Sequence, residues 1–267
     1  LGTAFHAERE AASGVGRSDA PEIEMAAQKA RTAEDLHRFI ELDFQLAKRM
    51  SRLHDIRYDN SEFFGNKNIE HTQAEREWRY SVGNHWHVGK RDGLVRHKQT
   101  GKYYLLEYKT AAYSPNYFNR LELDRQCSSN LQALVHEGVD VAGVIYDVTH
   151  KPLIKMLKDR KTKPDETIEE FHDRFIETMA ADKLKYFERR IVYRTPEQLA
   201  EHDSDVHQIF AQIENAHATN SWPRNTSNCD KYGRLCAFFS VCGGGQAGAE
   251  IGGMFRIRER KLPELSE

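Results

Sequence analysis

The segment from Gly89 to Lys109, GKRDGLVRHKQTGKYYLLEYK, constrains the fold of this chain more than any other part of the sequence. Its two halves read as strands joined by a polar loop, KQTG, in which Gly101 can take the positive φ that such loops often need. Centring the hairpin in the middle of this loop puts Asp92 opposite Glu107, where opposed Cβ atoms lie about 4.5–5.5 Å apart. The strand period of two puts Lys109 on the same face as Glu107. The sequence therefore predicts an aspartate, a glutamate and a lysine on one surface.

Two carboxylates at this spacing suit a hard divalent cation such as Mg²⁺ or Mn²⁺, which binds one or two carboxylates together with waters and phosphate oxygens. A lysine beside them can orient a metal-activated water and offset charge at a scissile phosphate. The run YYLLEYK is apolar up to Glu107, so its charge lies at the end of a buried strand, where an uncompensated carboxylate is costly. These features predict phosphodiester hydrolysis, and the alternative is a hairpin that carries surface charges without a metal.

Two further motifs accompany the hairpin. The chain opens LGTAFHAERE, in which Gly2 precedes His6 by four residues, and LELDRQCSSNLQAL places Gln126 on a predicted helix after the E-x-K strand. Taken with Asp92, Glu107 and Lys109, these motifs resemble the PD-(D/E)XK nuclease superfamily. The similar branch is the RecB-like one, which includes nuclease domains of bacterial recombination exonucleases and CRISPR-associated and phage nucleases.

The resemblance implies a role for each matching residue. It makes Asp92 and Glu107 metal ligands, assisted by His6 and the backbone carbonyl of Tyr108. It makes Lys109 the residue that organises the attacking water. Gln126 would steady that lysine or the substrate, and the Q-x-x-x-Y motif to which it belongs departs from the family pattern at Asn130, where tyrosine is usual. Judged by spacing alone, a lone histidine on a helix and a glutamine on an amphipathic helix are more often ordinary surface or core residues.

Three of the four cysteines, Cys229, Cys236 and Cys242, fall within NCDKYGRLCAFFSVC. The sequence shows no signal peptide and no apolar run that could span a membrane, so we expect a reducing cytoplasm, where clustered cysteines are better explained as metal ligands than as disulfides. Thiolates favour zinc or an iron–sulfur cluster, and buried thiols without a metal are the third interpretation. The C-x6-C-x5-C spacing resembles the iron–sulfur RecB-like nucleases, in which these cysteines and one far upstream hold a [4Fe–4S] cluster.

The upstream cysteine of that pattern has no counterpart in this sequence. The chain begins at Leu1 without a methionine and inside the histidine motif, so we expect the fourth cluster ligand to precede Leu1. Cys127 is the other candidate, but it adjoins Gln126 beside the predicted active site. On this interpretation the chain as given holds iron poorly.

Composition limits the way in which the chain can bind nucleic acid. Charged residues make up 30% of the 267 residues and the formal net charge is −2, so any binding must depend on local patches rather than on overall attraction. One such patch runs from Lys151 to Pro164, with six basic residues and one acid, and a solvated loop is the alternative interpretation. The basic tail from Phe255 to Lys261 is weaker support.

The order of predicted elements is alternating. An amphipathic helix from Ala33 to Leu53 precedes three strands, a helix bearing Gln126 and a β-branched buried strand, VDVAGVIYDV. The sequence predicts an α/β fold, and the resemblance implies a restriction-endonuclease-like core, a central mixed sheet flanked by helices, with a C-terminal helical and cysteine segment. The predicted strands span 73–82, 85–96 and 102–109, the helix that bears Gln126 spans 120–136, and helix, strand and helix follow at 167–179, 187–194 and 195–219.

Three regions are expected. Residues 1–220 would form the nuclease core, with a helical insertion near 33–53; residues 221–242 the cysteine segment; and residues 243–267, which include a glycine-rich run, a flexible tail. Two other features of the sequence have functional interpretations. His85 and His87 alternate on a strand without an acidic third ligand, which is weak support for zinc, and Trp78, Trp86 and Trp222 read most simply as core or lid aromatics.

We therefore expect a Mg²⁺- or Mn²⁺-dependent deoxyribonuclease in the cytoplasm of a bacterial, archaeal or phage-infected cell. Exonuclease action on DNA ends or single strands is favoured, because nothing in the chain resembles a base-reading module. The expected partners are DNA and a helicase or another recombination or adaptation protein, without a membrane. The alternative is a nucleic-acid-binding scaffold subunit of a recombination or CRISPR adaptation complex, with a silent nuclease site. A zinc-held interaction domain would explain the cysteines but not the Asp92–Glu107–Lys109 group.

Overall fold

The computed structural model describes residues 33–59, 63–114, 116–158, 164–230 and 235–244. It divides into two compact units, one ending at Gln208 and the other beginning at Ile209. This division falls within helix α7 (Pro196–Thr219), upstream of the expected boundary at residue 220. His6, the basic tail at 255–261 and part of the 151–164 patch lie outside the described residues. No helix in the described part of the chain is both long and apolar enough to cross a bilayer.

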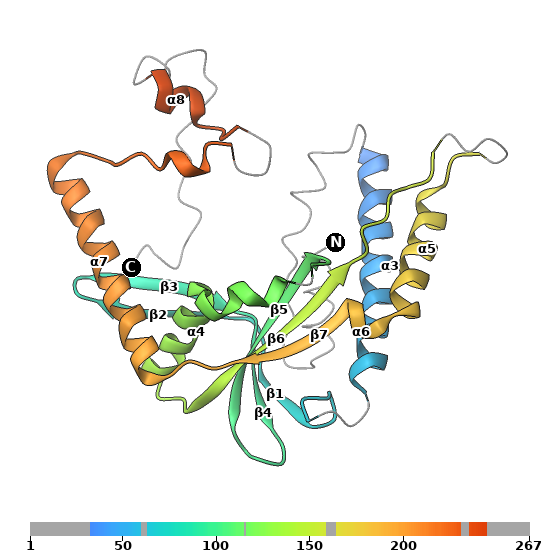
Figure 1. The fold of residues 1–267 in the computed structure, drawn as a ribbon, viewed down its shortest axis with the longest axis horizontal. Helices are drawn as coiled ribbons and strands as arrows, with labels where there is room; N and C mark the ends of the chain where they lie inside the picture. Colours follow the sequence, from blue (N-terminus) through green and yellow to red (C-terminus); the bar gives the residue numbers. More distant parts are fainter. Residues whose placement is uncertain (1–32, 60–62, 115, 159–163, 231–234, 245–267) are drawn as a thin grey trace. The chain divides into compact units, whose positions relative to one another are not determined.

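The first unit is an α/β fold with a mixed five-stranded sheet flanked by helices, as the sequence predicts (Figure 1). The strand order is β1-β4-β5-β6-β7. Only β5 and β6 run parallel, and the other neighbours are antiparallel. The strands are β1 (Ile69–Gln73), β4 (Gly93–His97), β5 (Tyr103–Ala112), β6 (Val141–Lys151) and β7 (Phe187–Val192).

The β4–β5 hairpin has the register that the sequence predicts. Gly93 pairs with Leu106 and Arg96 with Tyr103, so the next position in the same register sets Asp92 opposite Glu107. Gly101 has a φ of 70°, in the left-handed region that a side chain disfavours. The KQTG loop therefore turns at Gly101, the residue that the sequence predicts for a positive φ.

The predicted strand from residue 85 to 96 was wrong in one respect, because the chain leaves one sheet and enters another at Asp92. Strand β3 (His85–Arg91) pairs with β2 (Arg76–Val82) in a separate two-stranded ribbon, whereas β4 belongs to the main sheet. The run HWHVGKRDGLVRH is suited to a strand throughout, so local pattern does not mark the break. Because of this break, β3 and β4 lie in different sheets on either side of Asp92.

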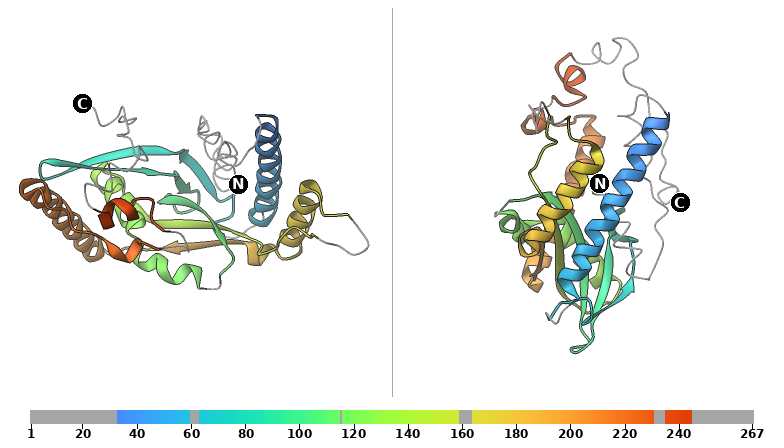
Figure 2. Two further views of the ribbon diagram at one scale, coloured as in Figure 1. Left: turned by 90° about the horizontal axis from the view of Figure 1, so that it is seen from above. Right: turned by 90° about the vertical axis from the view of Figure 1, so that its right-hand side faces the viewer.

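Helices flank the main sheet. On one face, the 3₁₀ helix η1 (Tyr117–Leu123) and helix α4 (Arg125–His136) pack on side chains of β5 and β6, with Leu105, Val144, Tyr146 and Val148 in the core. On the other side, helix α3 (Ala33–Tyr58) and helix α5 (Ile168–Ala181) lie side by side (Figure 2). The short helix α6 (Lys183–Tyr186) leads from α5 into β7.

Helix boundaries follow their capping residues. The Asp124 side chain accepts the backbone N–H of Gln126 at 2.9 Å, so α4 begins after Asp124 rather than near residue 120, and η1 precedes it. Thr167 and Glu170 form a capping box at the start of α5. Thr195 likewise accepts the N–H of Gln198 at 3.2 Å at the start of α7, which agrees with the helix predicted from residue 195.

The second unit includes the end of α7, the 3₁₀ helix η2 (Thr226–Asn228) and the short helix α8 (Phe239–Gly244). The cysteine segment lies here. Cys236 donates its backbone N–H to the carbonyl of Cys229 at 2.7 Å, and Cys242 donates its own to Phe238 at 2.9 Å. A helical and cysteine-bearing segment therefore follows the sheet unit, as expected.

Candidate metal and hydrolysis site

Asp92 occupies the point at which strand β4 begins and the β2–β3 ribbon ends. Its Oδ2 atom accepts the backbone N–H of Tyr108 at 2.8 Å, a bond that would otherwise go to the neighbouring strand. In an antiparallel ladder one residue exchanges both its N–H and its C=O with the same neighbour, so the Tyr108 carbonyl faces the same edge as its N–H. The Asp92 carboxylate and the Tyr108 carbonyl thus share one edge of β5.

The alternation of β5 puts Glu107 and Lys109 on the face covered by α4, and Tyr108 on the other face. Lys109 Nζ lies 2.5 Å from Glu107 Oε1 and 2.9 Å from Gln126 Oε1. Gln126 Nε2 donates to Glu107 Oε1 at 2.6 Å, which closes a three-residue ring of hydrogen bonds. Gln126 reaches this ring because Asp124 caps α4 and places it in the first turn of the helix.

Electrostatics at this group favours a cation. Burial first, and then the negative charge of Asp92, raise the pKa of Glu107 from its ordinary 4.5 to about 7, against the opposing effect of Lys109. Burial alone would lower the pKa of Lys109, but the carboxylates of Glu107, Asp92 and Asp124 raise it. The Glu107 side chain is 1% exposed and that of Lys109 is 22% exposed. Three carboxylates therefore surround one ammonium group, and a divalent cation would balance the excess negative charge.

The residues present fit a magnesium-type ion better than a zinc-type ion. Within the described ranges, no three His, Cys, Asp or Glu side chains converge on one point. Mg²⁺ does not require such a group, because it usually keeps several waters and takes one or two carboxylates with phosphate oxygens from the substrate. Asp92, Glu107 and the Tyr108 carbonyl supply that oxygen set, and His6, the fourth predicted ligand, lies outside the described residues.

Asn130, the departure from the tyrosine motif, lies beside Glu107. Its Nδ2 is 3.3 Å from Glu107 Oε2, and its Oδ1 accepts the indole N–H of Trp78 at 2.7 Å. Asn130 is 1% exposed and Trp78 is 7% exposed, so neither polar group has ready access to water. Trp78 is a core residue, as expected, but it also forms part of the surroundings of the candidate site.

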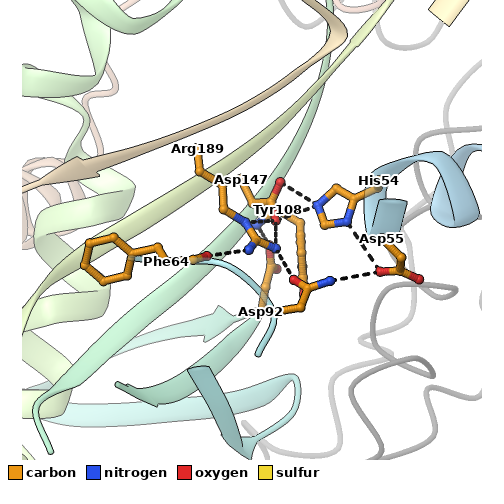
Figure 3. A network of polar contacts seen from close by, with 8 residues as sticks. His54, Asp55, Phe64, Asp92, Tyr108, Asp147 and Arg189 are labelled. Carbon is orange, nitrogen blue, oxygen red and sulfur yellow. Dashed lines mark hydrogen bonds and ion pairs between the residues drawn. The ribbon is translucent and has the colours of Figure 1, made fainter. Parts of the chain in front are cut away.

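A second buried network, which the sequence analysis did not predict, lies on the opposite face of β5 and β6 (Figure 3). His54 Nε2 on α3 is 2.8 Å from Asp147 Oδ2, and both side chains are 0% exposed. Arg189 Nε donates to the same Asp147 oxygen at 2.8 Å, and its other nitrogens bond the Phe64 carbonyl and Asn66 Oδ1. An aspartate inside the apolar run VDVAGVIYDV was the signal that could have indicated it.

Strands β5 and β6 connect the His54–Asp147–Arg189 network to the candidate site. Asp147 is the β6 partner of Tyr108, whose N–H is bonded to Asp92. The network thus fixes α3, β6 and β7 behind the strand that carries Glu107 and Lys109.

The four cysteines are free thiols. Burial raises the pKa of Cys127 to about 11, so this core residue of α4 stays protonated and is a poor metal ligand. Cys229 is half-buried, and Cys236 and Cys242 are exposed. These three do not meet as a three-ligand group in the part of the chain that the structure describes. The iron–sulfur cluster therefore remains a prediction, and no chemistry of the site depends on it.

Among the residues that the structure describes, His85 and His87 belong to no group of three side chains that could hold a metal ion. His87 Nδ1 is 2.8 Å from the Tyr80 hydroxyl, and the His87 ring lies edge-on to Trp78 at 5.2 Å. Burial lowers the pKa of His87, so the ring is neutral at pH 7 and packs between the aromatic residues of the ribbon.

Comparison with known proteins gave no match to any family model and no significant match to a curated protein.

Proposed function

We propose that this protein is a metal-dependent deoxyribonuclease that hydrolyses phosphodiester bonds. The observation that carries the proposal is the position of Lys109, whose ammonium group is bound by Glu107 at 2.5 Å and by Gln126 at 2.9 Å, with Asp92 across the hairpin. A buried carboxylate with a pKa near 7, a second carboxylate and a lysine at the end of a sheet strand match the needs of metal-assisted hydrolysis.

The roles follow from the contacts. Asp92 and Glu107, with the Tyr108 carbonyl, would hold a Mg²⁺ or Mn²⁺ ion, and His6 would add to this set. When bound, that ion would supply Lewis-acid activation of a water and of the phosphoryl oxygen. Lys109 would orient the attacking water and offset negative charge that develops on the phosphoryl group. Gln126 would keep the lysine aligned, because it accepts from Nζ and donates to Glu107.

The proposed substrate is DNA, attacked at ends or along single strands. Support for DNA comes from the resemblance of the motifs around Gly2, Asp92, Glu107 and Gln126 to RecB-like nucleases. Action at ends or single strands is favoured over site-specific cutting because nothing in the sequence resembles a base-reading module. The proposed setting is a bacterial, archaeal or phage-infected cytoplasm, where the four free thiols would persist. A helicase or another protein of recombination or CRISPR adaptation would be the partner.

A second candidate is a DNA-binding scaffold subunit with a silent nuclease site. One observation favours it: both oxygens of Glu107 already accept hydrogen bonds from Lys109, Gln126 and Asn130. A metal would have to compete with these three donors for the Glu107 oxygens. The scaffold candidate predicts DNA binding that is insensitive to divalent metal.

Incubation of the chain with end-labelled DNA separates the two candidates. The nuclease is expected to degrade the DNA with Mn²⁺ or Mg²⁺ and to stop when a chelator is added. Binding of the same DNA without cleavage, at every metal concentration tried, would favour the scaffold and contradict the proposed activity.

A further inference from the structure

The Trp78–Asn130–Glu107 contacts form a hydrogen-bonded chain with only one consistent direction. An indole N–H can only donate, so the Asn130 atom that faces Trp78 at 2.7 Å must be the amide oxygen. The amide nitrogen is then the atom that faces Glu107 Oε2 at 3.3 Å. Trp78 therefore sets the orientation of the Asn130 amide, so that its NH₂ group donates to Glu107.

Asn130 is the residue that holds the second oxygen of Glu107. Oε1 accepts from both Lys109 and Gln126, whereas Oε2 accepts from Asn130 alone among the described contacts. A carboxylate has about four acceptor positions, two on each oxygen, so Oε2 keeps one position for a further ligand. The three donors together fix the plane of the carboxylate and leave Oε2 as the atom available to a metal.

The position of Trp78 is itself set by the β2–β3 ribbon. Trp78 pairs with Gly89 across the ladder, and a Cβ at Gly89 would overlap the six-membered ring of the indole. On its own strand, Trp78 stacks near Tyr80, with ring centroids 5.7 Å apart and planes 17° apart. A glycine opposite the tryptophan therefore leaves the space in which the indole can lie flat and direct its N–H toward α4.

We propose that Asn130, oriented by Trp78, is a positioning residue that holds the Glu107 carboxylate with Oε2 directed at the metal. This inference rests on the proposed function, and it assigns a role to the residue at which the chain departs from the family motif. Because Trp78 belongs to the ribbon and Glu107 to the main sheet, the chain of bonds also links the two sheets at the site. Partners of metal ligands of this kind typically change metal affinity about 10–100-fold when removed.

Calorimetric titration with Mg²⁺ tests the effect on the metal. Asn130→Leu and Trp78→Phe are each expected to weaken Mg²⁺ binding about 10–100-fold, because each removes the donor that holds Oε2 or the group that orients it. Trp78→Phe keeps an aromatic ring in the ribbon, so it serves if Asn130→Leu fails to fold. Ser128→Ala is the matched control: it removes a partly buried hydrogen bond from Arg194 to the same helix, and Ser128 makes no hydrogen bond to Glu107. Wild-type affinity in Asn130→Leu and Trp78→Phe, or an equal loss in Ser128→Ala, would overturn the proposal.

A second measurement does not depend on metal or activity. The chain has three tryptophans, and ¹⁵N-labelled indole N–H signals of Trp78, Trp86 and Trp222 can be assigned with single Trp→Phe variants. Glu107→Gln in the metal-free protein is expected to shift the Trp78 signal and leave the other two in place, since only Trp78 is joined to Glu107 through Asn130. An unshifted Trp78 signal would overturn the positioning role. If the wild type binds no Mg²⁺ but the signal shifts, the proposed function fails while the linkage stands.

Discussion

Asp92 Oδ2 accepts the backbone N–H of Tyr108 at 2.8 Å, at the point where β4 no longer accompanies β5. A strand neighbour would normally take this bond, but Arg91, which precedes Asp92, belongs to the ribbon and pairs with Glu137 at the end of α4. The side chain of Asp92 thus replaces the missing strand. Its carboxylate is held at the edge of β5 beside Glu107, which is the geometry that two carboxylates need to share a cation.

Metal binding is expected to depend on pH through Glu107. Burial and the charge of Asp92 raise the pKa of this carboxyl to about 7, and only the ionised form binds a cation. Mg²⁺ affinity should therefore be full above pH 7 and fall by about tenfold for each unit below it, as the proton competes with the metal. Calorimetry at pH 6 and pH 8 measures this change, and equal affinity at the two values would contradict the assignment of Glu107 as a ligand.

The same group should affect stability in the metal-free protein. Between pH 4.5 and about 7 the folded state keeps a proton on Glu107 that the unfolded state has lost, so the free energy of unfolding falls as pH rises through this window. Glu107→Gln removes the titration, and its pH dependence of unfolding by urea should be flatter than that of the wild type. A variant with the same slope would show that another group is responsible.

Much of the site follows from the hairpin sequence. A strand period of two and a four-residue loop ending in Gly101 are local properties, and together they set the register that places Asp92 opposite Glu107. Gln126 was also predictable, because its motif lies on a helix expected at 120–136, and Asp124 caps that helix just before Gln126. These features depend on residues within about 35 positions of one another in the printed sequence.

The remaining features depend on contacts between distant segments. The sheet change at Asp92 is decided by what the ribbon packs against, namely α4, and not by the strand propensity of HWHVGKRDGLVRH. His54, Asp147 and Arg189 come from three elements, and none stands out in its own segment by spacing. From the sequence, Asn130 is only a departure from the expected tyrosine. Its role depends on a hydrogen bond from Trp78, which lies in the separate two-stranded sheet.

Asp147→Asn should lower the free energy of unfolding by about 3–5 kcal/mol, because it leaves the Arg189 guanidinium buried without its carboxylate. Urea denaturation measures the loss. Asp140→Asn, an exposed substitution just before β6, is the control and should change stability by less than about 0.5 kcal/mol. A loss below about 1 kcal/mol for Asp147→Asn would mean that the network contributes little to the fold.

Iron binding should distinguish the C-terminal cysteines from Cys127. After anaerobic reconstitution with iron and sulfide, we expect iron content and visible thiolate-to-iron absorption to fall when Cys229, Cys236 or Cys242 is changed to serine. Cys127→Ser should leave both unchanged, since burial raises the pKa of this thiol to about 11. Elemental analysis after anaerobic reconstitution checks the prediction. Zinc in place of iron, or an equal loss in Cys127→Ser, would rule out the cluster as proposed.

The proposed activity is tested most directly by the rate at which the protein cleaves end-labelled DNA with Mn²⁺. Lys109→Ala and Asp92→Ala should each reduce the rate at least about 10²-fold, and the double variant should lose little more, because both residues act on one water and one metal. Lys102→Ala, an exposed lysine on the same hairpin, is the matched control and should cleave like the wild type. Near wild-type cleavage by Lys109→Ala or Asp92→Ala, with each variant folded by circular dichroism, would contradict a hydrolytic site at Asp92, Glu107 and Lys109.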